Sequence, residues 1–166
     1  MSDILRLTLH APPFSINSAY YIKGSGKSST KIRTRECRAW GDDILIQLQR
    51  YQKEMTAFRD NFDIATNAIQ ISLRFLIPEG YYYTNLGTIS MRSKDLTNIE
   101  KLLVDLIFDE RFHLRSVGDI KVQNLNINDK LIVDLYSSKR PTRSEFRIEV
   151  EIVRIDNEFE LDGGYD

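Results

Sequence analysis

An apolar stripe in the first half of the chain constrains the fold more than any other sequence feature. Its members recur at steps of three and four residues, which places them on one face of an α-helix. They are Cys37, Trp40, Ile44, Leu48, Tyr51, Met55 and Phe58. The spacing therefore predicts one long helix over residues 37–58 with this stripe as its apolar face.

Strand patterns flank that helix on both sides. Apolar residues alternate with polar ones or cluster in short runs that end at proline or at turn residues. These patterns cover residues 4–9, 69–77, 131–136 and 146–152. A second, shorter helix is indicated by Ile99, Leu102 and Leu106. The order strand, helix, strand, helix and two strands predicts an α+β domain, with a small mixed sheet packed against two main helices.

The size of the chain allows one such domain. A length of 166 residues with 42% hydrophobic residues suits a single core. We assign residues 1–155 to the domain and residues 156–166 to an acidic tail. No apolar stretch approaches the roughly 20 residues that span a bilayer. The single cysteine and the lack of a secretory pattern in the first residues lead us to expect a cytoplasmic protein.

Charge is distributed unevenly along the chain, although the formal net charge is only -1. Six bases and one acid lie between Lys23 and Arg38, and the acids of the tail offset them. The stretch from Lys23 to Lys31 is rich in glycine and serine, so we expect a mobile loop there. Such a loop can bind DNA phosphates. The DNA-binding candidates are Lys23, Lys27, Lys31, Arg33 and Arg35.

The segment from Ser93 to Lys101 is the strongest candidate for chemistry. On the predicted helix, Asn98, Lys101 and Asp105 share one polar arc, and Asp95 stands at the start. A carboxylate, an amide and an ammonium suit a hydrated magnesium ion and a phosphate, the requirements of phosphodiester hydrolysis. In the structural alternative, Asp95 or Thr97 only caps the helix, and Lys101 and Asp105 only form an ion pair.

A second candidate, Asn128-Asp129, immediately precedes the strand at residues 131–136. An acid at the start of a strand can approach the helix start that carries Asp95, and hard divalent cations favour convergent oxygen ligands. We therefore expect Asp95 and Asp129 to lie close enough to share one ion. The alternative is that Asn128 and Asp129 make a turn.

Taken in order, these motifs resemble the RusA family of Holliday junction resolvases, over most of the chain to about Pro141. Family members carry a Pro-Pro-x-x-x-Asn start, an Asp-x-Asp-Asn-x-x-Lys-x-x-x-Asp helix and an Asp-Asp pair before a strand. The matching residues here are Pro12, Pro13, Asn17, Asp95, Asn98, Lys101, Asp105 and Asp129. The family's second helix aspartate falls on Thr97, and the first acid of its pair falls on Asn128. Asp105, Asp109 and Glu110 are nearby acids that can replace the missing carboxylate.

This resemblance implies a RusA-like fold and a magnesium-dependent endodeoxyribonuclease, with Mn²⁺ as a substitute, that resolves four-way or other branched DNA by paired nicks. It implies a homodimer in a bacterial or phage-infected cell. Catalysis would fall to Asp95, Lys101 and Asp129. Metal binding would involve Asp95, Asp129 and Asp105, with Thr97, Asn98 and Asn128 in support.

Two other functions stay open. Because a metal site that loses a carboxylate binds magnesium more weakly, the main alternative is a protein of the same fold that binds DNA junctions without cutting them. The last is a protein-interaction module with no DNA partner, which would account for the acidic tail but not for the clustered bases.

Overall fold

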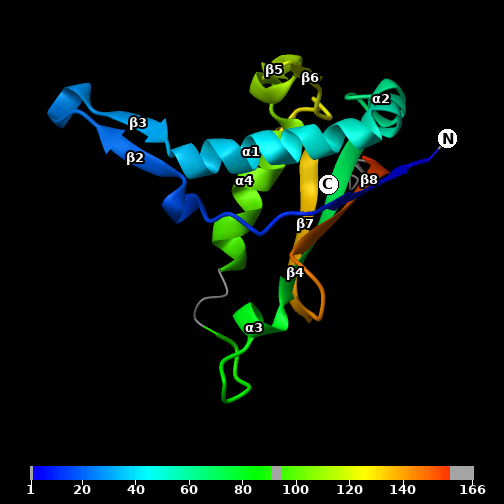
Figure 1. Ribbon diagram of the computed structural model, residues 1–166. Helices are drawn as coiled ribbons and strands as arrows, with labels where there is room; N and C mark the ends of the chain where they lie inside the picture. The colour runs from blue at the N-terminus through cyan, green and yellow to red at the C-terminus, as the bar shows by residue number, and fades with distance from the viewer. Residues whose placement is uncertain (1, 91–94, 158–166) are drawn as a thin grey trace, which may run out of the picture.

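A four-stranded mixed sheet forms the centre of the computed structural model, which describes residues 2–90 and 95–157 (Figure 1). The strands lie in the order β1-β8-β4-β7. Their bounds are Ile4–Leu9 for β1, Asn67–Pro78 for β4, Ile132–Thr142 for β7 and Arg147–Asp156 for β8. β8 pairs antiparallel with β1 and β4, whereas β7 runs parallel to β4. The expected α+β domain with a small mixed sheet is confirmed.

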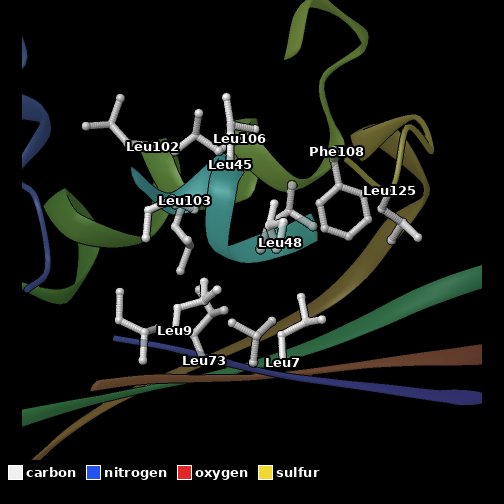
Figure 2. Packing of buried hydrophobic residues seen from close by; sticks show 14 of the residues in the cluster. Leu7, Leu9, Leu45, Leu48, Leu73, Leu102, Leu103, Leu106, Phe108 and Leu125 are labelled. Carbon is white, nitrogen blue, oxygen red and sulfur yellow. The ribbon is translucent and has the colours of Figure 1, made fainter. Parts of the chain in front are cut away.

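Helices cover one face of this sheet. They are α1 (Arg35–Leu48), α2 (Gln52–Asp60) and α4 (Leu96–Phe108). Leucines of α1 and α4, including Leu45, Leu48, Leu103 and Leu106, meet Leu7, Leu9 and Leu73 of the sheet (Figure 2). On the opposite face, arginine and glutamate side chains pair across the strands, as Arg6 does with Glu151 at 2.9 Å. The apolar core therefore lies between the sheet and the helices.

The predicted helix over residues 37–58 is wrong in one respect, because a 3₁₀ turn, η3 (Gln49–Tyr51), divides it into α1 and α2. Side chains of this turn bind other segments. The Tyr51 hydroxyl donates to the Thr8 carbonyl and accepts from the Thr8 amide, each at 3.1 Å. Gln49 bonds both backbone groups of Gln123. The stripe still faces the core, and only Tyr51 of its members is more than slightly exposed.

The expected loop at Lys23–Lys31 is shorter than predicted, because residues 24–29 connect the two strands of a β-hairpin whereas Lys23, Thr30 and Lys31 belong to those strands. β2 (Tyr20–Lys23) pairs antiparallel with β3 (Thr30–Arg33). The turn between them contains a 3₁₀ segment, η2 (Gly26–Ser28), and Gly24 and Gly26 have φ of 92° and 60°. Those left-handed conformations favour glycine. Glycine and serine therefore form the tip of an ordered ribbon.

Short elements complete the chain. They are η1 (Ile16–Ser18), α3 (Glu79–Tyr82), η4 (Glu110–Phe112), β5 (Arg115–Val117), β6 (Ile120–Val122) and η5 (Asp129–Leu131). β5 and β6 form a second hairpin in a segment without a sustained sequence period. None of the helices in the described ranges is both long and apolar enough to span a membrane. Residues 158–166 of the predicted acidic tail lie outside the described residues, and Asp156 belongs to β8.

The connection from β4 through α4 to β7 determines where the candidate residues lie. Because β4 and β7 are parallel, the intervening helix runs back along the sheet in the opposite direction. Near the start of α4, Ser137 of β7 donates to Glu100 at 2.5 Å. Near its end, the Leu125 amide, which precedes β7, donates to the Ile107 carbonyl at 2.8 Å. The start of α4 therefore lies beside the end of β7, and the end of α4 beside the start of β7.

Candidate functional site

The polar arc of α4 forms as the sequence predicts. Lys101 Nζ lies 3.4 Å from Asp105 Oδ1, and the Lys101 side chain is 61% exposed whereas that of Asp105 is 14% exposed. Asn98 lies one turn nearer the helix start and is partly buried. The ion pair predicted by the structural alternative is thus confirmed, and it holds the Lys101 ammonium at the surface. An ammonium in this position is available to an incoming phosphate.

Asp95 occupies the N-cap position of α4, but its side chain makes no capping hydrogen bond. Its backbone carbonyl accepts from the Asn98 amide at 3.1 Å, and the residue is exposed. Thr97 is exposed in the first turn. The Asp95 carboxylate is therefore not used to satisfy the helix start. Ser93 and Lys94, the first residues of this motif, lie outside the described residues.

Asn128 and Asp129 form the turn that introduces β7. The Asn128 side chain accepts from the Lys130 amide at 3.0 Å, which caps the short helix η5. Asp129 begins that helix and is exposed. The turn alternative is confirmed for Asn128, whose side-chain oxygen is engaged locally. The Asp129 carboxylate, in contrast, is not the group that caps η5.

A groove of about 420 Å³ lies beside Asp129 at the end of α4. Its lining residues are Phe108, Asp109, Glu110, Asn126, Asn128 and Asp129. Arg111 approaches Asp109 through Nε at 2.9 Å and Nη2 at 2.6 Å. These hydrogen bonds, more than any other cause, hold the pKa of the Asp109 carboxyl below its ordinary value. The negative charge of the Asp109 carboxylate is therefore balanced by the positive charge of Arg111.

The structure does not bring Asp95 and Asp129 together within one subunit, contrary to the expectation from the sequence. Asp95 stands at the start of α4, and Asp129 shares a groove with Phe108 at its end. A helix of 13 residues separates these positions by about 20 Å. Within residues 2–90 and 95–157, no group of three or more histidine, cysteine or acidic side chains is placed to hold a metal ion. A single subunit does not fit a shared magnesium ion.

The basic candidates gather at the other prominent feature, the β2–β3 hairpin. The hairpin projects beyond the start of α1 (Figure 1). Lys23, Lys27 and Lys31 are exposed on it, Arg33 is partly buried at its base, and Arg35 is the first residue of α1. No acid occurs from Asn17 to Arg35. All five predicted cationic residues therefore lie on the hairpin or where it joins α1.

Aromatic side chains join these bases, which the sequence alone did not indicate. Lys31 Nζ lies 4.5 Å from the centre of the Tyr20 ring, and the Arg33 guanidinium lies 4.7 Å from that of Phe112. Arg111 and Arg115 lie 5.9 and 5.7 Å from the same ring. Because Phe112 is far from the hairpin in the sequence, only the fold shows that the basic surface extends to the 108–122 region.

A backbone connection fixes the base of the hairpin to the domain. The Thr34 amide donates to the Ala19 carbonyl at 2.8 Å, and the Thr34 hydroxyl donates to the Ser18 carbonyl at 3.2 Å. The same hydroxyl accepts from the Cys37 amide, which caps α1. The hairpin therefore continues directly into a helix of the core, and its direction is set by that helix.

A scan against models of protein families finds no match for this chain, and a search of curated proteins finds none either. The fold and the site define the class more coarsely, as a single α+β domain that carries a projecting basic hairpin. Function must be inferred from that surface and from the residues of α4 and η5.

Proposed function

We propose that the chain binds branched DNA through the β2–β3 hairpin. The observation that carries this proposal is the hairpin itself, a projecting ribbon with Lys23, Lys27 and Lys31 exposed and no acid among its residues. Lysine and arginine neutralise phosphates and release their counterions, which supplies most of the affinity for a DNA backbone. A two-stranded ribbon also fits the width of the major groove.

Exposed apolar side chains on the same ribbon favour branched over plain duplex DNA. Tyr21 is 48% exposed and Ile22 is 73% exposed, and they point to opposite faces of β2. An aromatic face stacks on unpaired bases with a gain of about 1–3 kcal/mol per base. Unpaired or accessible bases occur at a branch point, so the ribbon offers contacts there beyond the phosphates.

We further propose that the bound DNA is cut, in a magnesium-dependent reaction with manganese as a substitute. The resemblance to RusA resolvases assigns this activity to Asp95, Lys101 and Asp129. Support comes from α4, where Lys101 is held at the surface and the Asp95 carboxylate is not used for capping. Asp105, mostly buried and paired with Lys101, positions that lysine. Because one subunit separates Asp95 from Asp129, cutting requires a homodimer.

Binding without cutting is the second candidate function. Thr97 and Asn128 stand where the family carries aspartates, and the Asn128 side-chain oxygen is engaged by the Lys130 amide. Each departure removes negative charge from a cation site, which weakens magnesium binding. A protein of this kind would protect or present a junction in the bacterial or phage-infected cell in which we place the resolvase.

A labelled four-way junction, incubated with and without magnesium, tests these proposals. We expect the wild-type protein to shift the junction in a gel and to nick it symmetrically only with magnesium. Asp129→Asn should abolish nicking and retain the shift, and Thr97→Asp should preserve or increase nicking. Asp119→Asn, which removes an exposed acid from the β5–β6 turn, is the matched control and should leave both readouts unchanged.

Three other outcomes would each remove part of the model. A shift without nicking by the wild-type protein selects the binding function. Undiminished nicking by Asp129→Asn refutes the assignment of that acid. Failure to shift junction or duplex DNA refutes the hairpin as a DNA-binding surface and favours a protein-interaction module.

A further inference from the structure

A small pocket lies where the β2–β3 hairpin joins the rest of the domain. Its volume is about 140 Å³, against about 420 Å³ for the groove beside Asp129. Residues of β3, α1, η4 and β5 line it, although these elements are distant in the sequence. They include Arg33, Arg38, Gly41, Asp42, Phe112 and Arg115. Because several separate elements contribute to the pocket, it exists only in the folded chain.

The ring of Phe112 organises two of the arginines in this pocket. The guanidinium groups of Arg33 and Arg115 lie 4.7 and 5.7 Å from the centre of the ring, and Phe112 itself is buried. A cation near an aromatic face is attracted by the electron density of the ring. Two guanidinium groups from distant segments are therefore held at one small space before any ligand binds.

The pocket contains more positive than negative charge. Its lining has three arginines and one acid, Asp42. The Arg115 Nη2 atom lies 3.8 Å from Asp42 Oδ1, which is too far for a hydrogen bond. Among the residues that the structure describes, none forms an ion pair with Arg33 or Arg38. Because like charges at short range repel, an anion in the pocket would relieve an excess of two positive charges.

Gly41 leaves one wall of the pocket without side-chain atoms. It lies in the middle of α1, where glycine is less favourable than alanine. An added Cβ would lie 3.5 and 3.7 Å from the two methyl carbons of Leu106, which are ordinary contact distances. Packing between α1 and α4 therefore does not require glycine at this position. A ligand that occupies the adjacent space would explain why no methyl group fills it.

Phosphate suits these lining groups better than other common anions. A guanidinium group donates paired hydrogen bonds to a carboxylate or to a phosphate. The two oxygens of a carboxylate lie in one plane, whereas phosphate oxygens point in several directions and can meet guanidinium groups from three elements. We propose that Arg33, Arg38 and Arg115 bind a single phosphate group of a DNA strand in this pocket. The choice of DNA rests on the proposed function of the hairpin, of which Arg33 is the last strand residue.

Two parts of a DNA strand supply this group. An internal phosphodiester carries one negative charge, and a phosphate at a strand end carries nearly two at neutral pH. The excess of two positive charges in the pocket matches the phosphate at a strand end more closely. The same three arginines would contact either group, so the two sources differ in affinity and not in the residues involved.

Inorganic phosphate tests the pocket without DNA. In proton–nitrogen correlation spectra at constant ionic strength, added phosphate should shift the side-chain Nε–H signals of Arg33, Arg38 and Arg115 along one saturating curve. The signal of Arg50, an exposed arginine beyond the end of α1, should stay in place. Shifts that grow without saturation at all four arginines would mean general ion binding and would overturn the pocket as a site.

Two substitutions separate the charge of the pocket from its space. Arg38→Gln removes an exposed cation and should weaken phosphate binding by about tenfold or more, whereas Arg50→Gln, the matched control, should not change it. Gly41→Ala keeps all three arginines and adds a methyl group at the wall, which should weaken binding by about tenfold. Its melting temperature should not fall, because alanine favours a helix. Wild-type affinity for phosphate in either pocket variant would refute the site.

Labelled four-way junctions whose arms end in phosphates or in hydroxyls identify the source. If the pocket binds a strand end, the wild-type protein should prefer the phosphorylated junction by about tenfold and Arg38→Gln should not. If it binds an internal phosphate, the two junctions should bind equally and Arg38→Gln should lower the salt slope by about one unit.

The same measurements distinguish failure of the pocket from failure of the proposed function. If Lys27→Ala weakens junction binding and Arg38→Gln changes neither the preference nor the slope, the pocket does not bind DNA and the hairpin proposal stands. If no junction binds while phosphate still shifts the three arginine signals, the DNA-binding proposal fails and the pocket remains a phosphate site.

Discussion

The β2–β3 hairpin and the acids of α4 and η5 were predicted from equally short motifs, but the fold treats them differently. The five bases of the hairpin region come from one continuous segment, Lys23–Arg35, so local strand pairing keeps them together. Asp95 and Asp129 come from segments that the β4–α4–β7 connection sends to opposite ends of a helix. Residues from one continuous segment stay close together in the fold. Residues from distant segments meet only if the connections between them run in suitable directions.

The largest expected effect concerns the hairpin. Changing Lys23, Lys27, Lys31 and Arg33 to alanine should reduce the slope of log K against log salt by about four units, one for each phosphate contact. At 0.15 M salt this amounts to a loss of affinity on the order of a thousandfold. Fluorescence anisotropy with a labelled junction at several salt concentrations measures both the slope and the affinity.

Exposed cations elsewhere supply the control for that experiment. Arg50 and Lys53 lie on the exposed side of the α1–α2 region. Their replacement by alanine should leave the salt slope nearly unchanged. Equal losses for both sets of variants would mean that binding follows overall charge, and the distinction between the hairpin and the rest of the surface would disappear.

Substitutions in the core beneath α4 should lower the free energy of unfolding far more than substitutions in the hairpin. Leu103 is fully buried at 0% exposure, so Leu103→Ala removes apolar contacts and leaves a cavity. The expected cost is about 2–5 kcal/mol in the free energy of unfolding. Ile22→Ala, at a position 73% exposed, should change it by less than about 0.5 kcal/mol. Urea denaturation followed by circular dichroism gives both values, and similar costs would show that the hairpin is packed in solution.

Periodicity predicted the elements well, and it failed where a side chain outside the local segment intervenes. The order of strands and helices and the buried stripe followed from spacing alone. The break at Gln49–Tyr51 did not, because it accompanies hydrogen bonds to Thr8 and Gln123, which are distant in the sequence. The loop was predicted too long at both ends because Gly24 and Gly26 were interpreted as flexibility, whereas their positive φ values form a turn between two paired strands.

The candidate site was predictable only as a set of residues. The pair Lys101–Asp105 and the turn at Asn128 follow from local spacing, and the structure contains both. Whether Asp95 approaches Asp129 depends on β7 running parallel to β4, and nothing in the local patterns specifies that direction. Phe112 likewise enters the basic surface only because its segment returns to the hairpin base. Contacts between distant segments were the part that sequence patterns could not supply.

Lowering the pH should destabilise the end of α4 before it affects the β2–β3 hairpin. The folded-state pKa of Asp109 is lowered, chiefly by its hydrogen bond from Arg111. A lowered pKa contributes stability that is present above the unfolded value, about 3.9 for aspartate, and is lost as the pH falls through the folded value. Because Arg111 is largely exposed, with its side chain at 69%, the effect should stay below about 1 kcal/mol. Stability measured from pH 5 down to pH 2 should fall less steeply for Asp109→Asn, and parallel curves would contradict the assignment.

Substitution of Lys101 should cause the smallest change in the free energy of unfolding. It also distinguishes most clearly between a structural and a catalytic role of this residue. Its ion pair with Asp105 is an i,i+4 contact with an exposed lysine, so Lys101→Met should alter the free energy of unfolding by no more than about 0.5 kcal/mol. If the pair is only structural, DNA nicking should persist at nearly the wild-type rate. If Lys101 contacts the scissile phosphate, nicking should be lost while unfolding and junction binding stay almost unchanged. Lys101→Arg, which keeps the charge and can still pair with Asp105, should then recover part of the activity, whereas equal loss of binding and nicking in both variants would make Lys101 one more phosphate contact like those of the hairpin.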